Sequence, residues 1–367
     1  MSKLSGRNPG LDILRSIAIL SVVFHHSLFL LMKDLPSNNL IRQIISVGPY
    51  GSLGVDLFFS LSGFLIGGIL IKSVANNRFH HFGDLWTFWM RRWLRTLPNY
   101  YLMILVHIAV VVALGKELNI AWNYIFFGQN LFHDPPDFFI ESWSLSIEEW
   151  FYFSFPILLF FAVKLAKSAE RIRIILFSIV FYLILFTVFR LFVDVDEIHN
   201  LNKEFKKIVI YRLDAIAYGL LAAFFFYYYE RNFYRYRIYI LFLGLICLTI
   251  IAYTTHKNIT GHEGTMVYYF NRYIHLSVSA IGFTCLLPFF YYLNNLNKIS
   301  ITVASFFSAV SYSLYLINIP VYEVLDEIAM NIWLKYILYW AICIYLSWIT
   351  FRYFEQPILK LRDKNFK

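Results

Sequence analysis

The stretch Leu11–Met32 reads LDILRSIAILSVVFHHSLFLLM, and it is apolar enough to cross a bilayer although it contains Asp12, Arg15, His25 and His26. A membrane helix normally excludes such side chains, because each costs several kcal/mol in hydrocarbon unless it is paired or solvated. Arg15 and His26 lie eleven residues apart, which is about three helical turns and roughly 16 Å, so both lie on one face. The stretch predicts a membrane span that holds a cation at one end of a polar site and an imidazole at the other. His25 lies about 80° away from that face and is expected to be a packing residue.

The whole chain has the composition of a membrane protein. Its 367 residues are 59% hydrophobic and 15% charged, whereas about a quarter of the residues in a soluble domain are charged. The formal net charge is +9, but the basic residues lie in short loops, so membrane topology explains them better than nucleic-acid binding. Cys247, Cys285 and Cys343 show no CxxC spacing, so we expect neither a metal site nor a disulfide framework.

Apolar runs of about 20 residues, the length needed to cross a bilayer, recur along the chain. They predict ten spans, at about 11–32, 50–72, 97–115, 145–163, 173–193, 208–229, 238–255, 274–293, 302–321 and 333–353. Basic and acidic loops alternate between them, and the positive-inside rule then places both termini in the cytoplasm. The sequence therefore predicts an all-α integral membrane protein with about ten transmembrane helices. We expect a single membrane domain over residues 1–367, with no separate soluble domain.

This orientation sorts the polar residues by depth. The cytoplasmic side holds the guanidinium groups of Arg15, Arg91, Arg92 and Arg95. Polar residues of five spans share a similar depth toward the outer side: His26, Asp56, Glu148, Glu149, Arg212, Asp214 and Asn318. Ionisable residues that converge in this way indicate a polar cavity.

Each of these residues also has a structural interpretation. The arginines before the third span could only mark topology, and Asp56 could cap its helix. Arg212 and Asp214 could pair with each other, and Asn318 could join two helices by a hydrogen bond. His26 is the hardest to explain in this way.

Six motifs, in order along the chain, resemble those of the acyltransferase 3 family of integral membrane acyltransferases. They are Leu11–Arg15 followed by His26, Gly54–Leu65, Arg91–Pro98, Ser142–Tyr152, Arg212 with Gly219, and Ser311–Leu316 with Glu355–Pro357. The resemblance covers a core of about residues 8–357. Asn318 stands where members often have histidine, which leaves a hydrogen bond rather than proton transfer at that position.

The resemblance implies a multi-pass O-acetyltransferase of the bacterial inner (cytoplasmic) membrane. Such an enzyme moves an acyl group, usually acetyl from acetyl-CoA, to a hydroxyl of a cell-surface polysaccharide or a related sugar acceptor. Its partners would be the acyl-CoA donor, the glycan acceptor and the lipid bilayer. We expect no nucleic-acid partner.

Donor binding is expected at the basic residues. The fork-shaped guanidinium donors of Arg91, Arg92 and Arg95 suit the phosphate groups of coenzyme A. Arg15 extends their field to the base of the first span. The pantetheine arm could then follow the Arg15–His26 face.

Catalysis is expected at the far end of that face. His26 would act as general base toward the acceptor hydroxyl or as the acyl acceptor itself. Glu148, preferred on motif grounds, or Asp56 would orient its imidazole. Arg212 and Asn318 are the expected substrate-binding residues.

Three alternatives remain open from the sequence. The first is a transporter, although no inverted repeat is evident. The second is a transmembrane acyl carrier that supplies a separate outer-side transferase, because we expect no hydrolase-like C-terminal domain of the kind that some family members carry. The third is a sensor or scaffold descended from the enzyme, which the retention of Arg15, His26 and Glu148 argues against.

Overall fold

The computed structural model describes residues 8–34, 50–118, 120–165, 171–192, 206–259, 264–293 and 296–366, and every regular element in those ranges is helical. The helices of ten residues or more are α1 (Pro9–Asp34), α3 (Tyr50–Ala75), α4 (Phe82–Ala113), α5 (Ser142–Leu165), α6 (Arg171–Phe189), α8 (Leu213–Tyr228), α10 (Arg237–Ile259), α12 (His275–Thr284), α14 (Lys298–Glu327), α15 (Ile332–Thr350) and α16 (Gln356–Asn365). The shorter elements are η1 (Trp122–Phe126), η3 (Arg190–Phe192), η4 (Val209–Tyr211), α9 (Glu230–Arg235), α11 (Thr265–Tyr273), α13 (Leu287–Tyr291) and the π-helical turn η5 (Phe351–Glu355).

The prediction of an all-α membrane protein is confirmed. Eight of the described helices are long and apolar enough to cross a bilayer, and a ninth span arises if the bent pair Thr265–Tyr273 and His275–Tyr291 counts as one. The predicted span 208–229 corresponds to α8, whose 16 residues extend over only about 24 Å. The count of ten spans and the cytoplasmic location of the termini stay predictions.

The third predicted span, 97–115, corresponds to the second half of a longer helix. The helix α4 begins at Phe82 and runs for 32 residues. Leu85, Phe88 and Trp89 are buried at helical spacing, so an apolar stripe continues the helix toward its N-terminus. The arginines of this segment lower its hydropathy, so the apolar run begins at residue 97 although the helix begins at Phe82.

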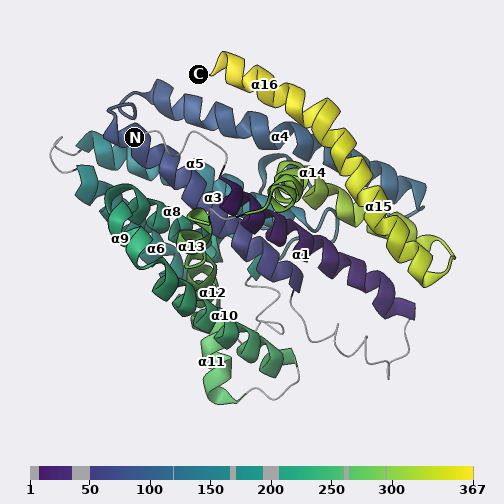
Figure 1. Cartoon of the computed structure of the whole chain (residues 1–367). Coiled ribbons are helices and arrows are strands. Elements are labelled where there is room, and N and C mark those ends of the chain that lie inside the picture. The colour runs from purple at the N-terminus through teal and green to yellow at the C-terminus, as the bar shows by residue number, and fades with distance from the viewer. Residues whose placement is uncertain are drawn as a thin grey trace.

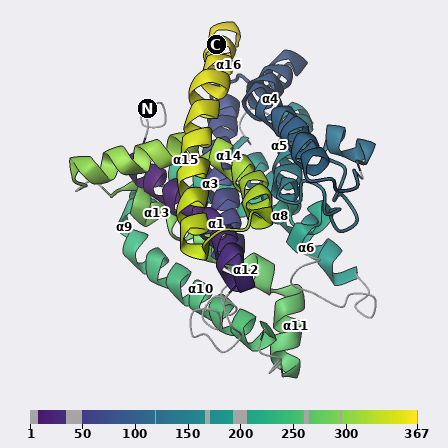
Figure 2. The same cartoon turned by 90° about the vertical axis from the view of Figure 1, so that its right-hand side faces the viewer.

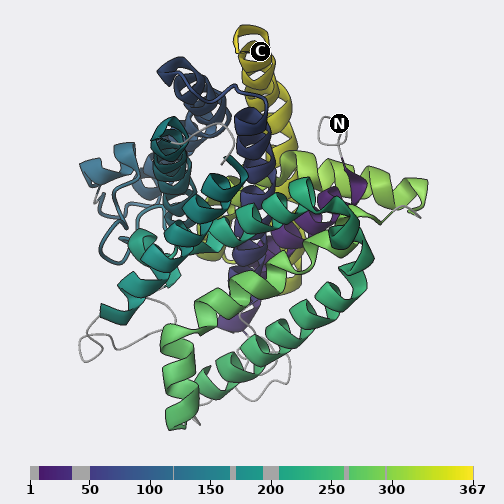
Figure 3. The same cartoon turned by 90° about the vertical axis from the view of Figure 1, so that its left-hand side faces the viewer.

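The centre of the molecule is formed by α1 and α3, which pack against each other, with α14 against α1 and α8 against α3. In Figure 1 these helices lie side by side, and in Figure 2 α4 and α5 flank them on one side. Figure 3 shows α10 along the edge of the molecule, where it packs against α12.

Glycines set the contact between α3 and α8. A Cβ atom on Gly63 of α3 would overlap the backbone of Ile216, and one on Gly219 of α8 would overlap the backbone of Ser60. The two backbones therefore touch, as is typical of membrane helices that meet at glycines. This contact fixes α3, which carries the predicted site residue Asp56.

Candidate functional site

One pocket brings together most of the predicted donor-binding residues. Arg15 from α1, Arg92 and Arg95 from α4, and Glu148 from α5 all line it. The space between its walls measures about 860 Å³, a figure that includes the open solvent at its mouth. Its apolar walls come from Val55, Phe58, Phe59, Leu61, Leu65, Ile66 and Leu145.

The pocket is positively charged. Three guanidinium groups face one carboxylate among the lining residues, an excess of two positive charges. Glu148 accepts a hydrogen bond from the Tyr152 hydroxyl at 3.1 Å and forms no ion pair with an arginine of the described residues. The Nε atom of Arg92 is buried and has no hydrogen-bond partner in the described part of the chain. The arginine donors are therefore available to an anionic ligand.

The fourth predicted donor-binding arginine points elsewhere. Arg91 donates to the backbone carbonyl of Phe366, which follows the end of α16. Its guanidinium also lies 3.5 Å from the carboxylate of Asp363, which is on α16. Arg91 and Arg92 are consecutive in α4, so their side chains point about 100° apart around the helix axis. The structure thus brings Arg15, Arg92 and Arg95 together and directs Arg91 to the C-terminal segment.

His26 contacts Asn318, which lies on α14. The Nδ1 atom of the imidazole meets the Oδ1 atom of the Asn318 amide. The amide nitrogen of Asn318 donates to the carbonyl oxygens of Leu314 at 3.2 Å and Tyr315 at 2.5 Å. Because carbonyl oxygens only accept, this orientation makes Oδ1 the acceptor and Nδ1 of His26 the donor. A neutral His26 then carries its lone pair on Nε2, the nitrogen suited to a general base or nucleophile.

The helix that carries Asn318, the partner of this histidine, also lines the pocket. Tyr315 lines the pocket and precedes Asn318 by three residues on α14, about 4.5 Å along the axis. The Tyr315 hydroxyl donates to the Glu141 carbonyl at 2.8 Å and accepts from Ser144, which lies 2.7 Å away. His26 itself does not line the pocket. Its partner Asn318 therefore lies about one helical turn from a residue that lines the pocket.

Comparison with known proteins is informative at this point. A family model described as an acyltransferase domain matches residues 8–352. The chain belongs to the acyltransferase 3 family. It is similar to "Putative peptidoglycan O-acetyltransferase YrhL" of Bacillus subtilis, with 34% identity over 184 residues, and to "Peptidoglycan O-acetyltransferase OatA" of Listeria monocytogenes, with 30% identity over 178 residues. These matches cover 46% and 44% of this chain and 26% of each relative, and no solved structure matches significantly.

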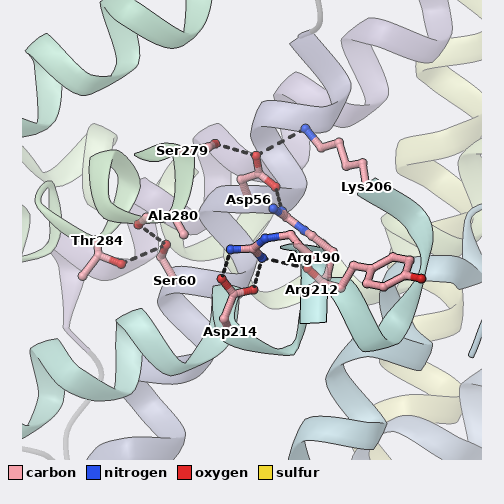
Figure 4. Close-up of polar contacts among 10 residues, drawn as sticks. Asp56, Ser60, Arg190, Lys206, Arg212, Asp214, Ser279, Ala280 and Thr284 are labelled. Carbon is pink, nitrogen blue, oxygen red and sulfur yellow. Dashed lines mark hydrogen bonds and ion pairs between the residues drawn. The ribbon is translucent and has the colours of Figure 1, made fainter. Parts of the chain in front are cut away.

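In this acyltransferase 3 protein, the predicted catalytic Asp56 and the predicted substrate-binding Arg212 pair with each other. Asp56 is buried, forms ion pairs with Arg212 and with Lys206 at 3.3 Å, and accepts from the Ser279 hydroxyl at 2.7 Å (Figure 4). Burial lowers the pKa of the Lys206 ammonium, and the neighbouring Asp56 carboxylate opposes that shift. The guanidinium of Arg212 also lies 5.6 Å from the centre of the Phe59 ring.

A second buried ion pair lies beside the first. Asp214, which could have paired with Arg212, pairs instead with Arg190 at 2.8 Å (Figure 4). Arg190 also donates to the Ser277 hydroxyl. Neither ion pair contacts His26 in the described residues. The geometry makes these charges links between α3, α8, α12 and η3.

Sequence reasoning missed several buried charges. Arg190 lies near the end of the predicted span 173–193, and Lys206 lies just before the predicted span 208–229; both spans were assigned by hydropathy. His107, in the middle of the predicted span 97–115, carried the same signal as His26, an ionisable side chain inside an apolar run. In the described residues, no group of three His, Cys, Asp or Glu side chains is placed to hold a metal ion.

Proposed function

We propose that this chain is a multi-pass O-acetyltransferase of the bacterial inner membrane that transfers acetyl from acetyl-CoA to a hydroxyl of a cell-surface polysaccharide. The proposal is supported by the chain's membership of the acyltransferase 3 family and by the names of its relatives, which are described as peptidoglycan O-acetyltransferases. Its acyltransferase core would be about residues 8–357 within a single membrane domain. The observation that carries the proposal is one pocket lined by three arginines and by Tyr315, which lies one helical turn from Asn318, the partner of His26.

Donor binding follows from the charge of the pocket. Arg15, Arg92 and Arg95 would hold the phosphate groups of coenzyme A, because planar guanidinium groups bind phosphate oxygens in pairs. Glu148 limits the positive charge of the pocket and fixes Tyr152 in its wall. The apolar walls would receive the pantetheine arm.

Acyl transfer would take place beyond Tyr315. The Nε2 atom of His26 removes the proton of the acceptor hydroxyl, and the oxygen attacks the thioester carbonyl carbon. The carbon–sulfur bond then breaks, and the thiolate takes the proton back from His26. In a second route, Nε2 first accepts the acetyl group and then passes it to the hydroxyl.

The test is an assay of the full chain in proteoliposomes with radiolabelled acetyl-CoA and a glycan extract from the source cell. Thiol release together with label on the glycan supports the proposal. Thiol release that requires an added outer-side transferase supports the acyl-carrier alternative instead. Movement of label across the bilayer without thiol release supports a transporter and overturns the proposal.

A further inference from the structure

A second histidine lies deep in the helix bundle, paired with a carboxylate. The Nε2 atom of His107 on α4 lies 3.0 Å from a carboxylate oxygen of Glu141, and both side chains are 2% exposed. The Nδ1 atom of His107 lies 2.8 Å from the Met103 carbonyl, one turn back along the helix. Since a carbonyl only accepts, Nδ1 carries a hydrogen and Nε2 faces Glu141.

Such a pair is costly to bury and therefore calls for a role. Each charge loses its hydration, and the attraction between the two rarely does more than offset that loss. Among the described residues, neither carboxylate oxygen of Glu141 has a partner with hydrogen-bond geometry, and the 3.0 Å contact with Nε2 of His107 is their closest charged approach. A pair of apolar residues would fill the same space at lower cost, so stability alone does not account for these two side chains.

The backbone next to Glu141 is held in an uncommon conformation. Phe139 has a φ angle of 48°, in the left-handed region that bulky residues seldom adopt. Its ring is buried and packs 4.2 Å from the His107 imidazole, centre to centre. Backbone outliers of this kind persist where the surroundings hold them in place, and they are enriched at functional sites.

A continuous series of contacts leads from this pair to His26. The backbone carbonyl of Glu141 accepts the hydrogen bond of the Tyr315 hydroxyl at 2.8 Å. The carbonyl of Tyr315 accepts from the Asn318 amide at 2.5 Å, and the Asn318 oxygen meets Nδ1 of His26. The series therefore joins α4, the start of α5, α14 and α1.

We propose that His107 and Glu141 are positioning residues for His26. The close contact of their side chains holds the backbone at Glu141, and the Glu141 carbonyl holds the Tyr315 hydroxyl. Tyr315 in turn fixes the Asn318 amide and the tautomer of His26. The inference rests on the proposed function, since it assumes that His26 carries out the acyl transfer.

The test is a double-mutant cycle on acetyl transfer by the full chain in proteoliposomes. Glu141→Gln and Tyr315→Phe are made singly and together, with kcat and the KM for acetyl-CoA measured for each. We expect each single variant to lower kcat about 10- to 100-fold with little change in KM, because small misplacements of reacting groups have effects of that size. The double variant should be no slower than the slower single variant, because both changes break one series of contacts.

Matched controls separate positioning from folding. Glu323→Gln removes another carboxylate whose charge acts on His107, but it lies outside the series of contacts and should keep the wild-type kcat. If Glu141→Gln does not insert, Tyr315→Phe and His107→Gln still test the series. The inference is overturned if the activation free energies of the two single variants add in the double variant. It is also overturned if kcat falls only in proportion to the amount of folded protein.

His26→Ala in the same preparation distinguishes the two proposals. If His26→Ala is inactive while the Glu141 and Tyr315 variants turn over like wild type, only the positioning role fails. If His26→Ala is as active as wild type, the proposed role of His26 fails, and the positioning role that depends on it fails with it.

Discussion

The imidazole of His26 and the amide of Asn318 form one hydrogen-bonded unit across α1 and α14, although 292 residues separate them in the sequence. The unit has a fixed direction, because the Asn318 nitrogen is bound to two carbonyls of its own helix. An asparagine can thus set the tautomer of a histidine without exchanging a proton with it. The same orienting contact is made by a carboxylate in many catalytic pairs.

This arrangement makes Asn318 a sensitive position. We expect Asn318→Ala to lower kcat for acetyl transfer about 10- to 100-fold, because the imidazole loses its orienting acceptor. The KM for acetyl-CoA should change little, since Asn318 does not line the donor pocket. Ser347→Ala is the control, because that buried hydroxyl binds only a carbonyl of its own helix. Equal kcat values for the Asn318 variant and wild type would contradict the orienting role.

The four arginines of the predicted donor site should divide into two groups. Arg92→Gln and Arg95→Gln should each raise the Kd for coenzyme A about 10- to 100-fold, since a hydrogen bond to a charged group contributes about 1.5–3 kcal/mol. Arg91→Gln should leave the Kd essentially unchanged, because Arg91 faces α16. Calorimetric titration of coenzyme A into the detergent-solubilised protein measures all three. An effect of Arg91→Gln as large as the others would show that the pocket extends to that residue.

The buried charges between α3, α8 and α12 should matter for stability. Asp214→Ala leaves the fully buried guanidinium of Arg190 without its carboxylate, which should lower the free energy of unfolding by about 3–5 kcal/mol. Asp363→Ala removes an exposed partner of Arg91 and should have a much smaller effect. Thermal unfolding in detergent compares the two variants with wild type. Similar melting temperatures for both would argue against a structural role of the Arg190–Asp214 pair.

The close contact of α3 with α8 gives a prediction at a glycine. Gly219→Ala should lower the melting temperature, because the added Cβ would overlap the backbone of Ser60. Gly83→Ala on α4 is the matched control, since no atom lies within 4 Å of its added Cβ. Alanine favours helix over glycine by up to about 1 kcal/mol, so the control should be neutral or stabilising. A Gly219→Ala variant as stable as Gly83→Ala would mean that the helices separate easily.

Much of the fold could be predicted from the sequence, because each apolar run satisfies its own backbone as a helix. That Arg92 and Arg95 point the same way could be anticipated for a similar local reason, since residues three and four apart share a helical face. The structure places both in the wall of the pocket, and the packing of α1 adds Arg15.

Partners across helices could not be predicted in the same way. Whether Arg212 meets Asp214 or Asp56 depends on how α8 is rotated against α3, which is set by the glycine contact between them. The direction of Arg91 depends on where α16 docks, and the partner of His26 depends on the packing of α14 against α1. Such relations arise only when the whole bundle is assembled.

The central claim is that His26 carries out acyl transfer from acetyl-CoA. Its most direct test compares His26→Ala with His25→Ala in membranes, by thiol release from acetyl-CoA in the presence of a glycan extract. His25 is the neighbouring histidine, and its ring packs against Gly51 and Phe29. The account predicts that His26→Ala abolishes thiol release while the protein still inserts, and that His25→Ala retains it. Wild-type turnover in His26→Ala would contradict the account.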